Sequence, residues 1–236
     1  ETATTQEDTT QTEPEIAPTP GILPLSGRVI GIDPGHQEHG NFDREPVKPG
    51  GKETKAKVST GTQGVSTKTP EHVVNLEVSL KLRDALEDAG AKVVMTRETA
   101  DVDISNIERA VMMNEAGADL VLRLHCNGAD TKSANGIALY VRKNGACAQE
   151  SKAAAENILA CMVDATGAKN RGIVRNDSYT GLNWSEVPSI LVEMGFMSNP
   201  AEDERLGSAE YQDKLVAGML EGIMETFGLP EGVVGE

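Results

Sequence analysis

Three short apolar runs, each followed at once by residues that can carry chemistry, place the strongest constraint on the fold of this chain. The runs lie at 28–33, 119–125 and 189–194, and each leads into a segment that contains Gly, Asn or Ser. Short, nearly continuous apolar runs are typical of strands buried on both faces of a parallel sheet. Because the carboxyl ends of parallel strands lie at one edge of a sheet, side chains at these ends are expected to meet in one crevice.

Strands and helices alternate from Arg28 onward. Further strands are predicted at 92–97 and 136–142, and helices at 70–89, 105–116, 148–165 and 208–227. This alternation predicts a single α/β domain, with a mostly parallel twisted sheet and helices on both faces. We place this domain at residues 27–230, followed by a C-terminal tail at 231–236.

The N-terminal segment has a different composition. Residues 1–26 are rich in Thr, Pro, Glu and Gln and contain almost no large apolar side chain before Ile22, which predicts a disordered linker. The chain begins at Glu1 rather than Met. We interpret this as the loss of a signal peptide or an anchor, and we therefore expect a secreted or cell-wall-associated protein.

Composition narrows the choice of partners. A net charge of -15 argues against nucleic acid, which needs a basic surface. No apolar run approaches the roughly 18 residues of a membrane span, so none is expected. The three cysteines lack CxxC spacing, which argues against a disulfide framework and against a cysteine-bound zinc. Cys126 follows His125 directly, so its side chain is expected on the opposite face of the strand. We expect a monomer.

Residues 37–68 form a long segment rich in Gly, Lys and Thr, without clear periodicity. A long loop inside a compact domain is usually functional or disordered. This one carries more Lys and Arg than Asp and Glu although the whole chain is acidic. We interpret it as a long loop insertion that covers the site and meets a carboxylate-bearing substrate. The alternative is a surface insertion without function.

The first candidate ligand is His36. Pro34 and Gly35 force a turn that lifts its imidazole out of the sheet edge. The alternative, a turn that cradles phosphate, lacks the GxGxxG or GK[ST] pattern that such turns carry. His39 remains an alternative ligand in place of His36.

The second candidate histidine, His125, ends the second apolar run. Asn127 shares its strand face and is suited to orienting a ligand or a substrate amide. Arg123 lies on the same face and needs a carboxylate partner, but its role, structural or substrate-binding, is left open. His72 is expected on the surface of its helix.

Two glutamates complete the set. Glu71 falls in the first turn of its helix, on the core-facing stripe, with Asn75 one turn further on. The alternative is a glutamate whose only role is a favourable interaction with the positive end of the helix dipole. Glu193 ends a strongly apolar run, where a solvated charge is not expected. Two imidazoles and one carboxylate with an open position, plus a spare carboxylate, form a catalytic zinc site. A fourth protein ligand would instead make the site structural.

At these residues the chain resembles the zinc-dependent N-acetylmuramoyl-L-alanine amidases of the amidase type 3 family, over about residues 28–227. The resemblance rests on four segments and on two framework positions. They are Asp33-Pro34-Gly35-His36, Glu71 with Asn75, Leu124-His125-Cys126-Asn127, Val192-Glu193-Met194-Gly195-Phe196-Met197-Ser198-Asn199, Thr96-Arg97 and Glu108-Arg109. The family often has Gly-Gly where this chain has Gln37-Glu38.

The resemblance implies a Zn²⁺ enzyme that acts on peptidoglycan and cleaves the amide between N-acetylmuramic acid and L-alanine. It implies His36, Glu71 and His125 as metal ligands and Glu193 as the catalytic residue. Two alternatives remain, a non-catalytic module that binds the cell wall and a zinc peptidase that acts on stem peptides.

Overall fold

The computed structural model describes residues 23–145 and 147–229. Most of the predicted linker, up to residue 22, and the predicted C-terminal tail lie outside the described residues. The strands are β1 (Val29–Pro34), β2 (Asn41–Pro46), β3 (Thr54–Val58), β4 (Lys92–Met95), β5 (Leu120–Asn127), β6 (Ile137–Val141), β7 (Asn170–Arg175) and β8 (Ser189–Phe196). The helices are α1 (Glu71–Asp88), α2 (Asn106–Glu115), α3 (Ala148–Thr166), α4 (Thr180–Asn183), α5 (Pro200–Leu206) and α6 (Ala209–Thr226).

A six-stranded sheet in the order β4-β1-β5-β8-β6-β7 forms the centre of the domain. β4, β1, β5 and β8 run parallel, β6 is antiparallel to β8, and β7 runs parallel to β6. The predicted α/β fold with a mostly parallel sheet is therefore confirmed. β1, β5 and β8, the strands of the three apolar runs, are neighbours, so their carboxyl ends lie side by side.

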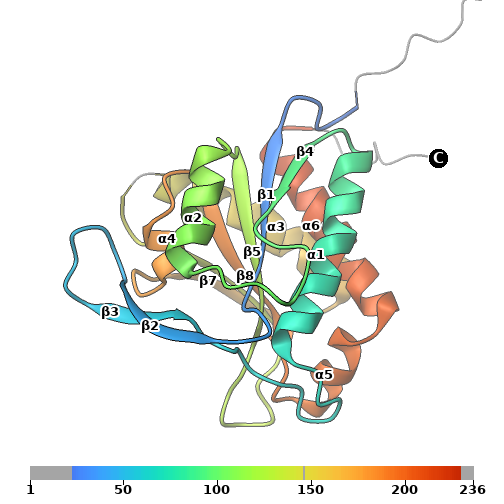
Figure 1. Cartoon of the computed structure of the whole chain (residues 1–236). Coiled ribbons are helices and arrows are strands. Elements are labelled where there is room, and N and C mark those ends of the chain that lie inside the picture. Colours follow the sequence, from blue (N-terminus) through green and yellow to red (C-terminus); the bar gives the residue numbers. More distant parts are fainter. Residues whose placement is uncertain (1–22, 146, 230–236) are drawn as a thin grey trace, which may run out of the picture.

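Helices cover both faces of this sheet (Figure 1). On one face α1, α3 and α6 bury the main core, which includes Ile32, Val78 and Leu122. On the other face α2 and α4 lie together, and a smaller cluster forms around Met113 and Val121. Cys126 belongs to the main core, as the alternation of side chains along β5 predicts.

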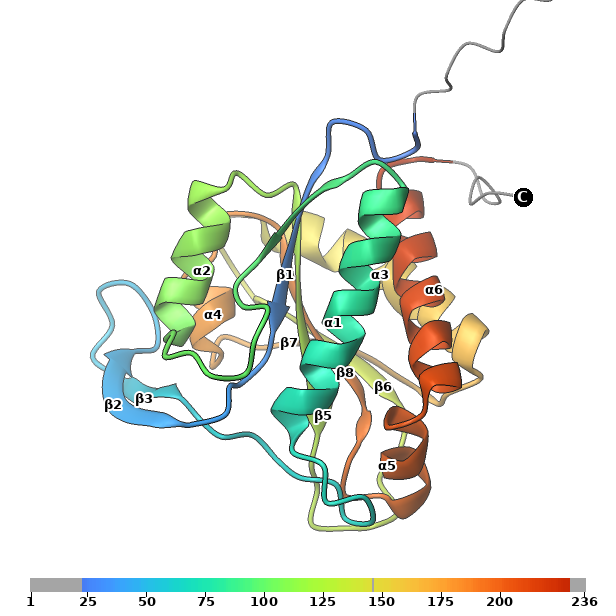
Figure 2. The ribbon, with the colours of Figure 1, turned by 45° about the vertical axis from the view of Figure 1, so that its right-hand side comes forward.

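The segment predicted as a long loop, residues 37–68, contains a regular element. β2 and β3 pair as an antiparallel hairpin, which lies beside α2 and α4 and away from α1 and α6 (Figure 2). The prediction of an irregular loop was wrong here. Half of the side chains of β2 are exposed and its buried residue is the charged Glu45, so the sequence lacks the alternation of apolar and polar residues that marks a strand.

The predicted N-terminal boundary of the domain also needs correction. Leu25 is fully buried in the main core, and its backbone N–H donates to the Ala89 carbonyl over 2.8 Å. The folded domain therefore includes residues before Gly27, and a linker that runs to residue 26 is too long. No helix within residues 23–145 and 147–229 is long and apolar enough to cross a membrane.

Candidate active site

The carboxyl ends of three adjacent strands bring the candidate residues together. His36 follows β1, His125 lies near the end of β5, and Glu193 is its register partner on β8. Paired residues of neighbouring strands point to the same face, so His125 and Glu193 face the same space. The fourth residue of the group, Glu71, is the first residue of α1 and lies beyond the carboxyl ends of these strands.

His36 occupies an unusual backbone position. Its φ is 60°, in the left-handed region that non-glycine residues rarely adopt, and it turns the imidazole toward Glu71. The Ser59 carbonyl lies 2.8 Å from Nδ1 and can only accept, so Nδ1 carries the proton. In the neutral imidazole Nε2 is then the bare nitrogen, 3.2 Å from Oε1 of Glu71. Burial lowers the pKa of His36, but the hydrogen bond and the charge of Glu71 outweigh burial and raise the pKa overall.

Glu71 is buried and points inward, as its place on the helix stripe predicts. Its carboxylate accepts hydrogen bonds from the backbone N–H of Thr62 at 2.8 Å and of Cys126 at 3.0 Å, and from Asn75 Nδ2 at 3.2 Å. Burial raises the pKa of this carboxyl, but the hydrogen bonds and charges of the two histidines outweigh burial and leave the pKa well below its usual value. Glu71 is therefore held as a carboxylate.

His125 lies on the other side of Glu71. Its Nδ1 is 3.2 Å from Oε1 of Glu71, and its Nε2 is buried without a hydrogen-bond partner. Burial lowers the pKa of this imidazole, which favours the neutral form that binds metals. The rings of His36 and His125 meet edge to face, with centroids 4.8 Å apart.

The donor set fits a divalent metal ion. One ligand atom from each of His36, Glu71 and His125 lies within 4.8 Å of the others. Ligands about 2.0–2.2 Å from a tetrahedral zinc are roughly 3.3–3.6 Å apart, close to the two 3.2 Å separations found here. Among the described residues no other group of His, Cys, Asp and Glu meets this criterion. His39, the alternative ligand, is exposed and lies outside the group.

Glu193 lines the same cavity as the three donors, and this site cavity has a volume of about 560 Å³. Oε2 of Glu193 is buried and has no hydrogen-bond partner in the described part of the chain. Burial, and then the negative charge of Glu71, raise the pKa of Glu193 to about 8. A carboxyl group with this pKa exchanges protons near neutral pH, which suits a general acid or base.

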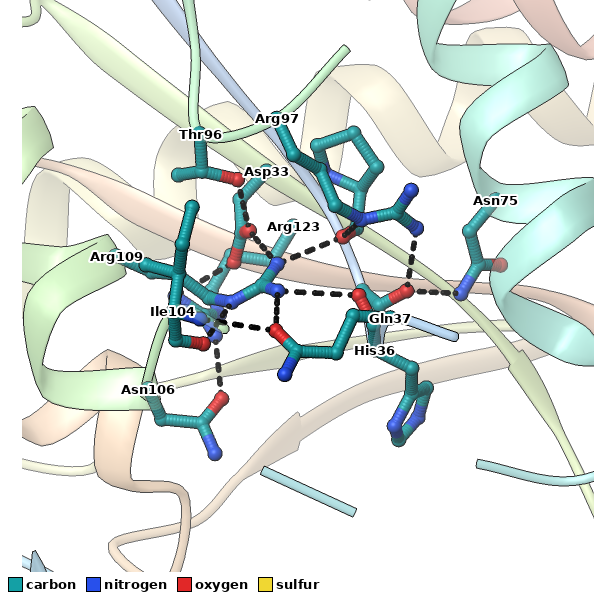
Figure 3. A network of polar contacts seen from close by, with 12 residues as sticks. Asp33, His36, Gln37, Asn75, Thr96, Arg97, Ile104, Asn106, Arg109 and Arg123 are labelled. Atoms are coloured by element: carbon teal, nitrogen blue, oxygen red, sulfur yellow. Dashed lines mark hydrogen bonds and ion pairs between the residues drawn. The ribbon is translucent and has the colours of Figure 1, made fainter. Parts of the chain in front are cut away.

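A buried network of charges holds the β1 end in place (Figure 3). Asp33 accepts hydrogen bonds from Arg109 at 2.8 Å and from Thr96 at 2.6 Å, and its other oxygen, Oδ2, forms an ion pair with Arg123 over 2.9 Å. Burial raises the pKa of Asp33, but the two guanidinium groups outweigh burial and lower it overall. Arg109 also donates to the His36 carbonyl over 3.1 Å, so the network fixes the backbone that carries the imidazole. The carboxylate partner expected for Arg123 is Asp33.

Gln37 is a supporting residue that the sequence did not reveal. It is fully buried, its Oε1 accepts from Arg109 Nη2 at 2.9 Å and from the Ile104 N–H at 3.1 Å, and its Nε2 donates to the His39 carbonyl at 3.0 Å. It therefore ties the turn after β1 to the segment that leads into α2. No sequence signal marks it, because its burial depends on contacts with residues about 70 positions away.

His72 and Arg97 lie together beside the turn that carries His36, and the position of His72 differs from the prediction. His72 is buried, not on the helix surface, because it follows Glu71 at the helix end that the site and the segment around Arg97 cover; its carbonyl accepts from Arg97 Nη2 at 2.9 Å. Arg97 also donates to the carbonyls of Pro34 and Gly35, at 2.9 and 3.1 Å. Both contacts support the turn that precedes His36.

Two imidazoles and a buried carboxylate around one point, with a second carboxyl group in the lining of the same cavity, are the set of side chains that metal-dependent hydrolases use. The model of the Amidase_3 family, N-acetylmuramoyl-L-alanine amidase, matches residues 30–225. The chain belongs to this family, and it is an amidase that acts on peptidoglycan.

Individual relatives agree with this assignment. The chain is 30% identical to the germination-specific N-acetylmuramoyl-L-alanine amidase of Bacillus subtilis, over 88% of this chain and 83% of the relative. The crystal structure of the N-acetylmuramyl-L-alanine amidase of Mycobacterium smegmatis matches with a TM-score of 0.79 and 25% identity, over 86% of this chain and 98% of the other. The enzyme of Clostridium difficile 630 matches with a TM-score of 0.72 and 28% identity, over 87% and 98% of the two chains.

Proposed function

We propose that this amidase depends on zinc and cleaves the amide between the lactyl group of N-acetylmuramic acid and L-alanine. The observation that carries the proposal is the spacing of the three donors, with Oε1 of Glu71 at 3.2 Å from a nitrogen of each histidine. His36, Glu71 and His125 hold the ion. When bound, zinc supplies a Lewis acid that polarises the scissile carbonyl and lowers the pKa of a water molecule.

The residues around the donors have separate tasks. Ser59 fixes the tautomer of His36 through its carbonyl, and Asn75 orients the Glu71 carboxylate from one helical turn away. The Arg109 contact to the His36 carbonyl keeps the ligand in its left-handed conformation. These contacts organise the site before substrate binds.

Glu193 is the proton-transfer residue of the proposal. Its side chain lines the site cavity and forms no hydrogen bond through Oε2 in the described part of the chain, so its carboxylate is free to accept a proton from the attacking water and then donate it to the departing amine. A pKa raised by burial suits both steps, because the group must hold the proton only between attack and departure. We also propose that the protein is a monomer and works outside the cell, at the wall.

Digestion of purified peptidoglycan, followed by mass analysis of the released fragments, tests the proposal. Release of intact stem peptides that begin at L-alanine is the expected result. Shorter peptides would identify a peptidase, and wall binding without any release would identify a binding module. Loss of activity in excess chelator, restored by added zinc, tests the metal.

A further inference from the structure

The hairpin of β2 and β3 forms a fixed wall of the site cavity. Asn106 Nδ2, at the start of α2, donates to the Lys57 carbonyl over 2.7 Å. Trp184 Nε1, at the end of α4, donates to the Pro46 carbonyl over 2.9 Å. Each strand of the hairpin is thereby tied to a different helix, so the backbone that carries Arg44 and Lys55 is held at the edge of the site cavity.

Two cations of this hairpin, Arg44 and Lys55, line the site cavity together with His36, His125 and Glu193. Both side chains are exposed. Across residues 23–145 and 147–229, their hydrogen bonds go to neutral acceptors. Arg44 donates to the carbonyl and the hydroxyl of Thr54, and Lys55 Nζ donates to the Ser178 carbonyl at 2.8 Å.

These two side chains have no ion-pair partner in the part of the chain that the structure describes. Within the described residues, neither Arg44 nor Lys55 forms an ion pair, whereas Lys57, on the same hairpin, lies 3.5 Å from Asp43. The third cation of the cavity, Arg123, is paired with Asp33. In a chain of net charge -15, two unpaired cations in one cavity are suited to binding an anion from outside.

We propose that Arg44 and Lys55 form a subsite that binds a free carboxylate on the stem peptide, at the residue that follows L-alanine. This inference rests on the proposed function, since it takes the scissile amide to lie at the metal ligands. A sphere with the volume of the cavity, 560 Å³, is about 10 Å across. Two extended residues span roughly 7 Å, so a carboxylate on the second residue of a peptide whose first amide lies at the metal ligands stays inside the cavity.

The test compares two N-acetylmuramoyl tripeptides that differ in one group, a free α-carboxylate or an α-amide on the second residue. The full chain is expected to show a kcat/KM about tenfold higher for the carboxylate form, the low end for a hydrogen bond to a charged group. In Arg44→Gln and Lys55→Gln the ratio of the two kcat/KM values falls, and in the double variant it approaches one. Lys52→Gln, in the hairpin turn and outside the cavity lining, keeps the wild-type ratio.

A ratio near one in the wild-type chain, or a ratio that survives in the double variant, would overturn the inference. Calorimetry with the two free tripeptides, the products, supplies a readout that does not need turnover. A lower Kd for the acidic tripeptide, lost in the double variant, supports the subsite, and equal Kd values overturn it. If neither substrate is cleaved, the proposed function fails, and the binding result still decides the subsite.

Discussion

Replacing Asp33 with Asn removes the carboxylate that forms ion pairs with Arg109 and Arg123, both almost completely buried. The amide keeps the shape of the side chain but takes away the negative charge that both guanidinium groups contact. Breaking a buried ion pair costs about 3–5 kcal/mol of unfolding free energy. For a domain of this size, about 2–4 °C of Tm are lost per kcal/mol, so Tm is expected to fall by about 6–20 °C.

Chemical denaturation, with zinc at one fixed concentration, measures this difference, because bound metal itself stabilises the folded state. Asp84→Asn is the matched control. Asp84 pairs with Arg83 at 2.7 Å, but its side chain is 64% exposed, and a surface pair contributes less than about 1 kcal/mol. A loss below about 1 kcal/mol in Asp33→Asn would refute the assignment of Asp33 as the centre of the network.

The pH dependence follows from the lowered pKa of Asp33. A carboxyl whose pKa is lower in the folded state stabilises the fold above its unfolded pKa of about 3.9, and the stabilisation is lost as the pH falls toward the folded value. The stability gap between the wild type and Asp33→Asn is therefore expected to narrow below about pH 4. A gap that stays constant down to pH 2 would contradict this linkage.

The remaining predictions concern the metal ligands and the domain boundary. Elemental analysis of the wild type is expected to give about one zinc per chain. His36→Ala and His125→Ala should each lower this zinc content, whereas His39→Ala should leave it unchanged. Loss of zinc in His39→Ala alone would show that His39, and not His36, is the ligand. Leu25→Ala should cost about 2–5 kcal/mol of unfolding free energy because Leu25 is fully buried, while Leu23→Ala, half-exposed, should cost less than about 0.5 kcal/mol. A chain that begins at Leu23 should accordingly have the Tm of the full chain, whereas a chain that begins at Gly27 should have a lower Tm. Equal Tm values for the two shortened chains would show that Leu25 does not stabilise the domain.

The parts of the fold that the sequence predicted are those with strong local patterns. β1, β5 and β8 are buried on both faces, so their apolar runs were visible, and Glu71 was placed by its helical spacing to Val74. The parts that were missed have weak patterns. β7 is mostly exposed, and α4 has only four residues.

In the site, too, residues marked by a local sequence pattern could be predicted and residues placed by long-range contacts could not. The positions of His36, His125 and Glu193 could be predicted because parallel strands share one carboxyl edge. The supporting contacts could not be predicted, because they join distant segments. Gln37 meets Arg109, and Lys55 reaches Ser178, through tertiary packing that no local pattern records.

The central claim is that three residues hold the metal and that Glu193 moves the proton. Glu193→Gln keeps the shape of the side chain and removes its basicity, so it tests the claim most directly. We expect turnover on peptidoglycan to fall by at least about a hundredfold, with zinc content and wall binding close to wild type. Loss of zinc in this variant would make Glu193 a fourth ligand, and undiminished turnover would remove it from the reaction.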